Sequence, residues 1–253
     1  MRVAITRDVA SSIVRCELTE IAREPIDVAR ARAQHAVYCD VLRTHGWDVA
    51  ELPVLEDHPD SVFVEDCAVV FDEIALMMRP GAESRRGEVE SVASVLGEHR
   101  ELRWIEAPGC VDGGDVIVQG RRVWVGRTTR SNEAAIAQMR ERLEEFGYEV
   151  RGVEVRGCLH LKSAATAFGE SRVVTNPEWV DVRVFEGCEV IETPAGESGG
   201  ANVVDLGDCV LVASRFPGVA QRVRDAGLEV ELVEADELAK AEGALTCCSV
   251  LVG

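Results

Sequence analysis

The sequence is poor in aromatic residues, short of basic residues relative to acidic ones, and free of long apolar runs. Aromatic residues make up 5% of the 253 residues, and 27 lysines and arginines stand against 45 aspartates and glutamates, a formal net charge of −18. We therefore expect no nonspecific binding of nucleic acid, and the charge is weakly compatible with a cationic substrate. No run approaches the roughly 18 apolar residues of a membrane span, and no apolar signal stretch precedes the first predicted strand. These absences favour a cytoplasmic protein without membrane association.

The cysteines form no recognisable framework, and nothing in the composition divides the chain. The nine cysteines are odd in number and include no CxxC pair. This pattern favours reduced thiols over a disulfide framework or a zinc site. No low-complexity segment or Pro/Gly/Ser-rich linker is present, so we expect residues 1–253 to form a single catalytic domain. We expect no metal and no cofactor.

Five glycines mark an internal repeat. Each precedes an alternating apolar stretch, and their spacings are 51, 50, 40 and 40 residues by subtraction of their numbers. These are Gly46, Gly97, Gly147, Gly187 and Gly227. A glycine just past a helix end can take the left-handed conformation that stops the helix, and alternation with period 2 predicts a half-buried strand. Apolar residues at helical spacing precede four of the five, and the segment before Gly187 is shorter.

Two further apolar runs in each repeat predict a hairpin. They lie at residues 67–71 and 74–78, 116–118 and 123–125, 164–168 and 173–174, and 203–206 and 210–212, with turn-forming residues between most pairs. The fifth repeat ends with one strand at 249–253, and the N-terminal residues 2–6 supply its partner. The predicted fold is a fivefold pseudo-symmetric α/β propeller of ββαβ-type units, closed by pairing of the N- and C-terminal strands.

A polar residue follows each glycine and its strand by 13 to 20 residues, and the fivefold pattern places these residues at equivalent points near one axis. They are Asp66, Asp112, His160, Asn202 and Cys247. Each has a structural alternative: a buried core histidine for His160, a tight turn for the DGGD run at 112–115, and backbone bonding for Asn202. An isolated cysteine is usually a small buried hydrophobe. A thiol, an imidazole and two acids at matching positions together favour an active site.

Five motifs that occur in order along the chain resemble those of the dimethylarginine dimethylaminohydrolases, which belong to the guanidine-modifying superfamily of fivefold α/β propellers. The motifs are DSVFVED (60–66), RPGAESRR (79–86), DGGD (112–115), LHLK (159–162) and LTCCSV (245–250). The resemblance implies hydrolysis of Nω-methylated arginine to citrulline and dimethylamine or methylamine. The expected partner is a small-molecule guanidino amino acid, and a homodimer is compatible with the sequence.

The resemblance also assigns roles to individual residues. It implies Cys247 as nucleophile, His160 as general acid and base, and Asp112 as the acid that orients the histidine. Among substrate-binding positions, it implies Asp66 for the guanidinium, Asp60 and Glu65 for further contacts, Arg85 and Arg130 for the α-carboxylate, Leu18 on a flexible lid, and Ala241 in the pocket wall. The chain departs from the family pattern at Ala241, where a larger aliphatic residue is usual, and at Glu242-Gly243, where the family often has Asp-Gly.

The proposed chemistry also follows from the residues themselves. A guanidinium is a poor electrophile, and a thiolate that attacks its central carbon divides one difficult step into two. A free cysteine has a pKa of about 8.5, so an imidazolium or the bound cation must favour the thiolate near neutral pH. Two other functions remain open: an arginine deiminase, which in that family is usually a longer chain with an inserted helical segment, and a noncatalytic propeller that binds a macromolecule.

Overall fold

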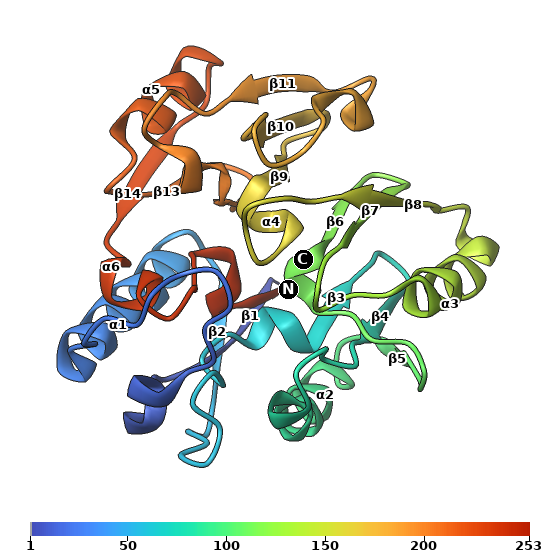
Figure 1. Ribbon diagram of the computed structural model, residues 1–253, viewed down its shortest axis with the longest axis horizontal. Coiled ribbons are helices and arrows are strands. Elements are labelled where there is room, and N and C mark those ends of the chain that lie inside the picture. Colours follow the sequence, from blue (N-terminus) through green and yellow to red (C-terminus); the bar gives the residue numbers. More distant parts are fainter. Residues whose placement is uncertain (1) are drawn as a thin grey trace.

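The computed structural model describes residues 2–253, which form five three-stranded sheets arranged around one axis (Figure 1). The sheets are β15 (Val250–Val252), β1 (Val3–Arg7) and β2 (Asp48–Leu52); β3 (Ala68–Val70), β4 (Ile74–Met77) and β5 (Glu101–Trp104); β6 (Val116–Gln119), β7 (Arg122–Arg127) and β8 (Glu149–Glu154); β9 (Ala165–Phe168), β10 (Arg172–Thr175) and β11 (Glu189–Glu192); and β12 (Val203–Asp205), β13 (Val210–Ala213) and β14 (Val230–Val233). In each sheet the middle strand runs antiparallel to the first and parallel to the third. The predicted fivefold α/β propeller is confirmed.

The two ends of the chain close the ring. Strand β1 pairs antiparallel with β15, with Val3 opposite Val252 and Ile5 opposite Val250. Both ends of the chain lie near the centre in Figure 1. The sheet they share leaves no blade of the ring incomplete, so closure through the N- and C-terminal strands is confirmed as well.

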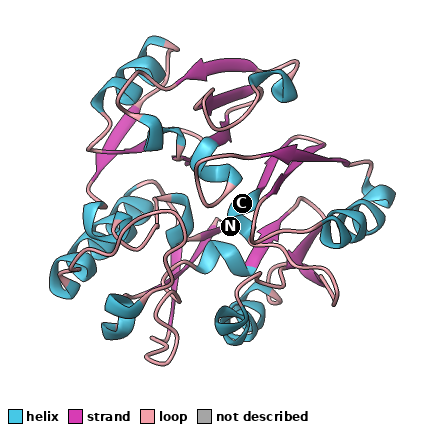
Figure 2. Cartoon of the chain, in the orientation of Figure 1, coloured by secondary structure: helices cyan, strands magenta, loops and turns pink. Residues whose placement is uncertain are grey.

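A helical segment connects the middle and third strands of each blade. The helices are α1 (Val28–Thr44), α2 (Val89–Leu96), α3 (Glu133–Leu143) and α5 (Pro217–Asp225), with the short α4 (Leu161–Ala164) and α6 (Asp236–Ala239) elsewhere. Figure 2 shows the four connecting helices toward the outside of the ring and most strands inside it. The fourth blade has only the 3₁₀ turn Val182–Phe185, in agreement with its shorter sequence before Gly187.

Four of the five repeat glycines take the left-handed conformation that can stop a helix, and one does not. Gly46, Gly147, Gly187 and Gly227 have φ between +75° and +83°. Gly97 also follows the end of its helix, α2, but its φ is −65°. There the chain continues in right-handed turns, because the amides of His99 and Arg100 both donate to the Leu96 carbonyl. Helix α2 therefore unwinds gradually before β5.

The first strands of all five sheets line a central cavity along the propeller axis. Glu65, Lys162 and Thr246 also line this cavity, and Lys162 Nζ lies 2.6 Å from Glu65 Oε1. The segments that precede the five first strands therefore meet at one end of the axis, where side chains from distant parts of the sequence can form a site. No helix within residues 2–253 combines the length and apolar character needed to cross a membrane.

Candidate active site

Each of the five polar residues of the repeat lies on or beside a short helical turn that leads into the first strand of a blade. Asp66 is in the turn Val64–Cys67, Asp112 precedes Gly113–Asp115, His160 precedes α4, Asn202 follows Ser198–Ala201, and Cys247 is in Thr246–Cys248. Each turn lies immediately before the first strand of its blade, near the propeller axis. The fold thus brings these residues to equivalent places.

Three of these five residues line one closed cavity, together with further residues that the sequence singled out. The cavity is lined by Glu17, Asp60, Phe63, Asp66, Arg85, Arg130, Leu159, His160, Ala241, Glu242, Gly243 and Cys247. Its volume is about 20 Å³, which is room for about one water molecule. Side chains that now fill it must move before an amino acid can enter.

His160 and Asp112 form a buried hydrogen-bonded pair. His160 Nε2 lies 3.0 Å from Asp112 Oδ2, and Asp112 Oδ1 accepts a 2.8 Å hydrogen bond from the Gly81 amide. Burial alone would lower the pKa of His160, but the carboxylates of Asp66, Asp112 and Asp115 raise it to about 9. The imidazole is therefore protonated at neutral pH and has a proton to give.

The DGGD motif is more than a turn. A Cβ at Gly114 would lie 2.7 Å from His160 Nδ1 and 2.9 Å from Asp66 Oδ1, so only glycine lets the backbone approach both groups. The second acid, Asp115, accepts hydrogen bonds from Ser131 Oγ at 2.5 Å and from the Leu161 amide at 2.9 Å. It thereby joins the loop beside Arg130 to the start of α4 beside His160. The sequence analysis missed this role, although the repeated aspartate in the motif was a signal for it.

Asp66 is held in its ionised form. It forms an ion pair with Arg85, and its Oδ1 accepts a 2.9 Å hydrogen bond from the Gly114 amide. Burial alone would raise the pKa of Asp66, but the charges of His160 and Arg85 lower it to about 2. A carboxylate in this state is suited to accept hydrogen bonds from a cation.

Arg85 faces the site, but its partners differ from the predicted ones. Its Nη2 lies 2.9 Å from Glu88 Oε2 and donates to the carbonyls of Asp60 and Phe63, while Nη1 pairs with Asp66. Nε donates to Glu88 as well. Most of the guanidinium is therefore occupied, and the structure does not present Arg85 as a free partner for an α-carboxylate. The neighbouring residue, Arg86, pairs with Glu83 at the surface instead.

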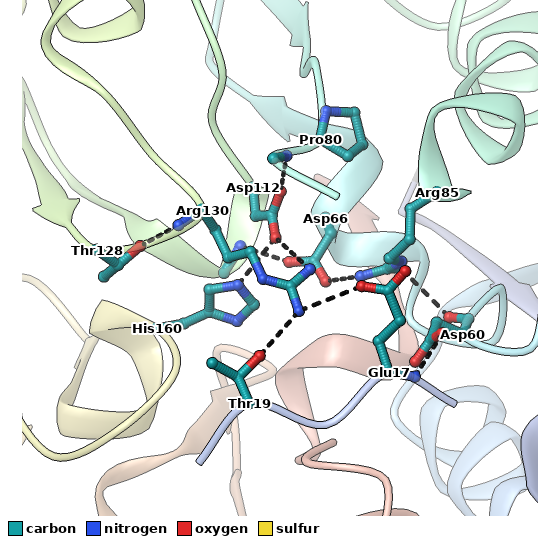
Figure 3. A network of polar contacts seen from close by, with 12 residues as sticks. Glu17, Thr19, Asp60, Asp66, Pro80, Arg85, Asp112, Thr128, Arg130 and His160 are labelled. Carbon is teal, nitrogen blue, oxygen red and sulfur yellow. Dashed lines mark hydrogen bonds and ion pairs between the residues drawn. The ribbon is translucent and has the colours of Figure 1, made fainter. Parts of the chain in front are cut away.

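Arg130 lies at the opposite side of the cavity and contacts the segment that includes Leu18 (Figure 3). Its Nη2 donates to Thr19 Oγ1 at 3.2 Å and lies 3.7 Å from a Glu17 carboxylate oxygen, while Nη1 is 4.0 Å from Asp112 Oδ2. Leu18 itself does not line the cavity and packs instead against an apolar cluster of the core. The polar neighbours of Leu18, which the sequence analysis did not select, are Glu17 and Thr19, and they are the residues of this predicted lid segment that contact Arg130.

Glu65 does not face the cavity that holds Cys247. Its two carboxylate oxygens accept from Lys162 Nζ and Thr246 Oγ1, each at 2.6 Å. Asn202 donates to Thr246 Oγ1 at 2.9 Å and accepts from the Thr246 amide at 3.1 Å. Glu65 and Asn202 thus fix the turn that carries the cysteine, and the backbone-bonding role considered for Asn202 is what the structure shows.

The two adjacent cysteines have different environments. Cys247 lines the cavity, whereas Cys248 donates a weak hydrogen bond from Sγ to the Ala244 carbonyl and packs in the core. Adjacent residues of a strand point to opposite faces, but these two cysteines lie on a 3₁₀ turn and the strand begins only at Val250. Burial raises the pKa of Cys247, and the nearby carboxylates of Glu65 and Asp66 raise it further. The resting group is a neutral thiol.

Glu242 binds the backbone of the predicted lid segment. Its carboxylate accepts hydrogen bonds from the amides of Thr19, Glu20 and Ile21 at 2.8, 2.5 and 2.8 Å. Its φ is +58°, a conformation that non-glycine residues rarely adopt and that is often found at functional sites. The substitution of glutamate for the aspartate usual in the family thus coincides with a direct connection between pocket wall and lid.

We expect Glu242→Gln to loosen the lid, because hydrogen bonds to a charged acceptor are about twice as strong as those between neutral groups. The amides of residues 19–21 should then exchange hydrogen roughly tenfold faster, since about 1.4 kcal/mol of lost stability corresponds to that factor. Hydrogen exchange followed by mass spectrometry measures this directly. Glu24→Gln, also in the lid segment, is the matched control, and equal exchange in both variants would argue against this role of Glu242.

The raised pKa of His160 also predicts how stability depends on pH. A folded-state pKa above the unfolded value stabilises the protein fully below pH 6.5, and this contribution is lost as pH rises through about 9. The free energy of unfolding should therefore fall by about 3 kcal/mol across this window. Urea titrations between pH 6 and 10 should show this slope in the wild type and a smaller one in His160→Asn. The same slope in both proteins would mean that His160 is not charged in the folded state.

A buried thiol, a protonated imidazole and an ionised carboxylate at the axis of a five-bladed α/β propeller define a class of protein: a propeller enzyme with a cysteine-based active site. Packing alone does not explain these residues, because burying ionised groups lowers the stability of the protein.

Comparisons with known proteins identify the family. The family model described as N,N dimethylarginine dimethylhydrolase, eukaryotic, matches residues 16–186. An N(G),N(G)-dimethylarginine dimethylaminohydrolase of Streptomyces coelicolor is 40% identical over 98% of this chain and 95% of its own length, and one of Pseudomonas aeruginosa is 33% identical over 88% and 89%. The chain belongs to the dimethylarginine dimethylaminohydrolase family. A crystal structure of a cysteine-to-serine variant of the Pseudomonas enzyme in complex with citrulline has a TM-score of 0.94 at 32% identity and covers 98% of both chains.

Proposed function

We propose that this enzyme hydrolyses Nω-methylated arginine to citrulline and dimethylamine or methylamine. The observation that carries the proposal is the meeting of Cys247, His160 and Asp66 in one cavity that also contains Arg130. These groups supply a nucleophile, a proton donor, an acceptor for a guanidinium and a partner for a carboxylate. The family names of the relatives point to the same reaction.

The resting state of the site defines the first step. Cys247 is a thiol before a cation binds, because burial and nearby carboxylates raise its pKa and oppose its ionisation. A substrate guanidinium bound against Asp66 places a positive charge beside the sulfur, so the thiol releases its proton to solvent as the cation binds and the thiolate forms. The thiolate then attacks the central carbon of the guanidinium and forms a carbon–sulfur bond. The enzyme thus activates its nucleophile only when the cation is bound.

His160 serves the two following proton transfers. Its imidazolium donates a proton to the methylated nitrogen, the carbon–nitrogen bond breaks, and the amine leaves. The neutral imidazole then accepts a proton from a water molecule that attacks the same carbon. The carbon–sulfur bond breaks, Cys247 is regenerated and citrulline is released. Asp112 holds the imidazole through its 3.0 Å contact with Nε2.

The remaining residues hold the rest of the substrate. Arg130 is assigned to the α-carboxylate, because its guanidinium points into the cavity and contacts only lid side chains and, more distantly, Asp112. Asp60 is assigned a further polar contact and Ala241 a place in the wall. Leu18 moves with the lid. Arg85 and Glu65 act through neighbouring groups instead of by direct contact, in keeping with their filled hydrogen-bonding capacity.

A product assay tests the function. Purified enzyme incubated with asymmetric dimethylarginine should release citrulline and dimethylamine in equal amounts, measured by chromatography with mass detection. The Cys247→Ser variant serves as the control for contaminating activity. Absence of both products from the wild type under conditions where the protein is folded would refute the proposal.

A further inference from the structure

The site contains a resident guanidinium beside the place where a second one must bind. Arg85 is almost fully buried and pairs through Nη1 with Asp66, the carboxylate assigned to the substrate cation. Left unbalanced, the charge of Arg85 would repel the substrate cation and offset the attraction that the ionised Asp66 exerts on it. Some other group must offset that charge.

Glu88 is placed to offset the positive charge of Arg85. Its side chain is 1% exposed, and it accepts from Arg85 Nε at 3.3 and 3.2 Å and from Nη2 at 2.9 Å. It therefore engages the edge of the guanidinium that faces away from Asp66. Glu88 does not line the cavity and cannot touch a substrate there. Neither the relatives' names nor the motifs noted in the sequence point to it.

The surroundings of Glu88 hold it firmly. Glu88 ends the 3₁₀ turn Glu83–Glu88, and its carbonyl accepts a 2.9 Å hydrogen bond from Ser91 Oγ, which in turn accepts from buried Arg7. Among the charged groups around Arg85, Glu88 and Asp66 raise the pKa of Arg85 well above its ordinary value against the opposing effect of burial. Arg85 therefore stays charged and fixed.

We propose that Glu88 is a positioning residue for the reaction, which holds Arg85 in place and balances its charge so that the negative charge of Asp66 remains available to the cationic substrate. The proposal rests on the proposed function. It predicts a selective effect: Glu88 matters for a ligand with a guanidinium and not for one with a neutral ureido group. Dimethylarginine and citrulline are such a pair, because they share the amino-acid backbone and differ in charge at the end of the side chain.

Calorimetry with both ligands tests the proposal. The Cys247→Ser protein is the parent, because it cannot form the covalent intermediate. Adding Glu88→Gln should raise the Kd for asymmetric dimethylarginine at least tenfold and change the Kd for citrulline less than threefold. Glu88→Asp, which keeps the carboxylate, should restore most of the affinity for dimethylarginine. Glu83→Gln is the matched control, because Glu83 lies in the same turn but pairs with Arg86 at the surface.

A second variant guards against a folding defect. Replacing both Arg85 and Glu88 by glutamine removes the pair, and the ratio of the two Kd values should return to within about threefold of the parent ratio. Equal weakening of both ligands by Glu88→Gln, no change for either, or no recovery in the double variant would overturn the role of Glu88. Failure of the proposed function gives a different result, since the unmodified enzyme would then form no citrulline from dimethylarginine.

Discussion

Cys247→Ser is expected to lower kcat by at least about 1,000-fold, whereas Cys248→Ser should retain most of the activity. Loss of a covalent nucleophile removes the step that divides the reaction in two, and such losses are among the largest seen in enzymes. Cys247 lines the cavity beside His160 and Asp66, while Cys248 is turned toward the core and the Ala244 carbonyl. Citrulline formation by both variants measures the difference.

Chemical labelling provides an independent check on the nucleophile. An alkylating agent built on an amidine should modify Cys247, because its cation binds beside Asp66 and favours the thiolate. Excess citrulline should slow the labelling by occupying the cavity. Peptide mapping that found the label on Cys248 and an unmodified Cys247 would show that the assignment is wrong.

His160→Asn should lower kcat by about 100- to 10,000-fold, the usual range for a general acid and base, and leave substrate binding within a fewfold. The asparagine retains a hydrogen-bonding group for Asp112 but has no proton to give to the leaving amine. Asp112→Asn should raise the activation free energy less, by on the order of 1 to 3 kcal/mol, because it removes a partner of the imidazole and not the imidazole itself.

Comparison of kcat with KM distinguishes these roles. Steady-state assays with dimethylarginine should show the loss in kcat for His160→Asn and a lesser loss for Asp112→Asn, with Asp225→Asn on the exposed end of α5 as a control. Rates near those of the wild type for His160→Asn would remove it from the proton transfers.

The blades could be predicted because their signals are local. Alternating apolar residues and repeat glycines determine which segments become strands and where helices stop, and each blade contains these signals within about 40 to 50 residues. The exception at Gly97 is instructive, because a glycine permits the left-handed conformation without requiring it. In this case, backbone hydrogen bonds from residues 98–100 determine the conformation instead.

The site was only partly predictable because several of its residues are defined by contacts between blades. The convergence of Asp66, His160 and Cys247 on one cavity follows from their repeat positions, which the propeller preserves, whereas their individual roles are implied by the family resemblance. The partners of Glu65 depend on side-chain directions that no spacing encodes, and the pattern gave no sign that Glu65 faces Lys162. The three lid amides that donate to Glu242 are more than 200 residues away in the sequence.

The sequence does contain a signal for the pairing of Glu88 with Arg85. Arg85 and Glu88 are three residues apart, a spacing that brings side chains together on one helical turn. Such pairs are usually solvated, so sequence alone gave no reason to place this one in the interior. Burial of these two side chains of the turn is what makes the pair relevant to the site.

The most direct test of the account compares kcat/KM for asymmetric dimethylarginine, monomethylarginine, arginine and agmatine. The methylated substrates should be preferred, because a methylated nitrogen can face an apolar wall, and each methyl group in such a pocket contributes about 1 to 3 kcal/mol. Agmatine should not be turned over, because it lacks the α-carboxylate assigned to Arg130. Higher efficiency with arginine, with release of ammonia, would contradict the account and indicate a deiminase.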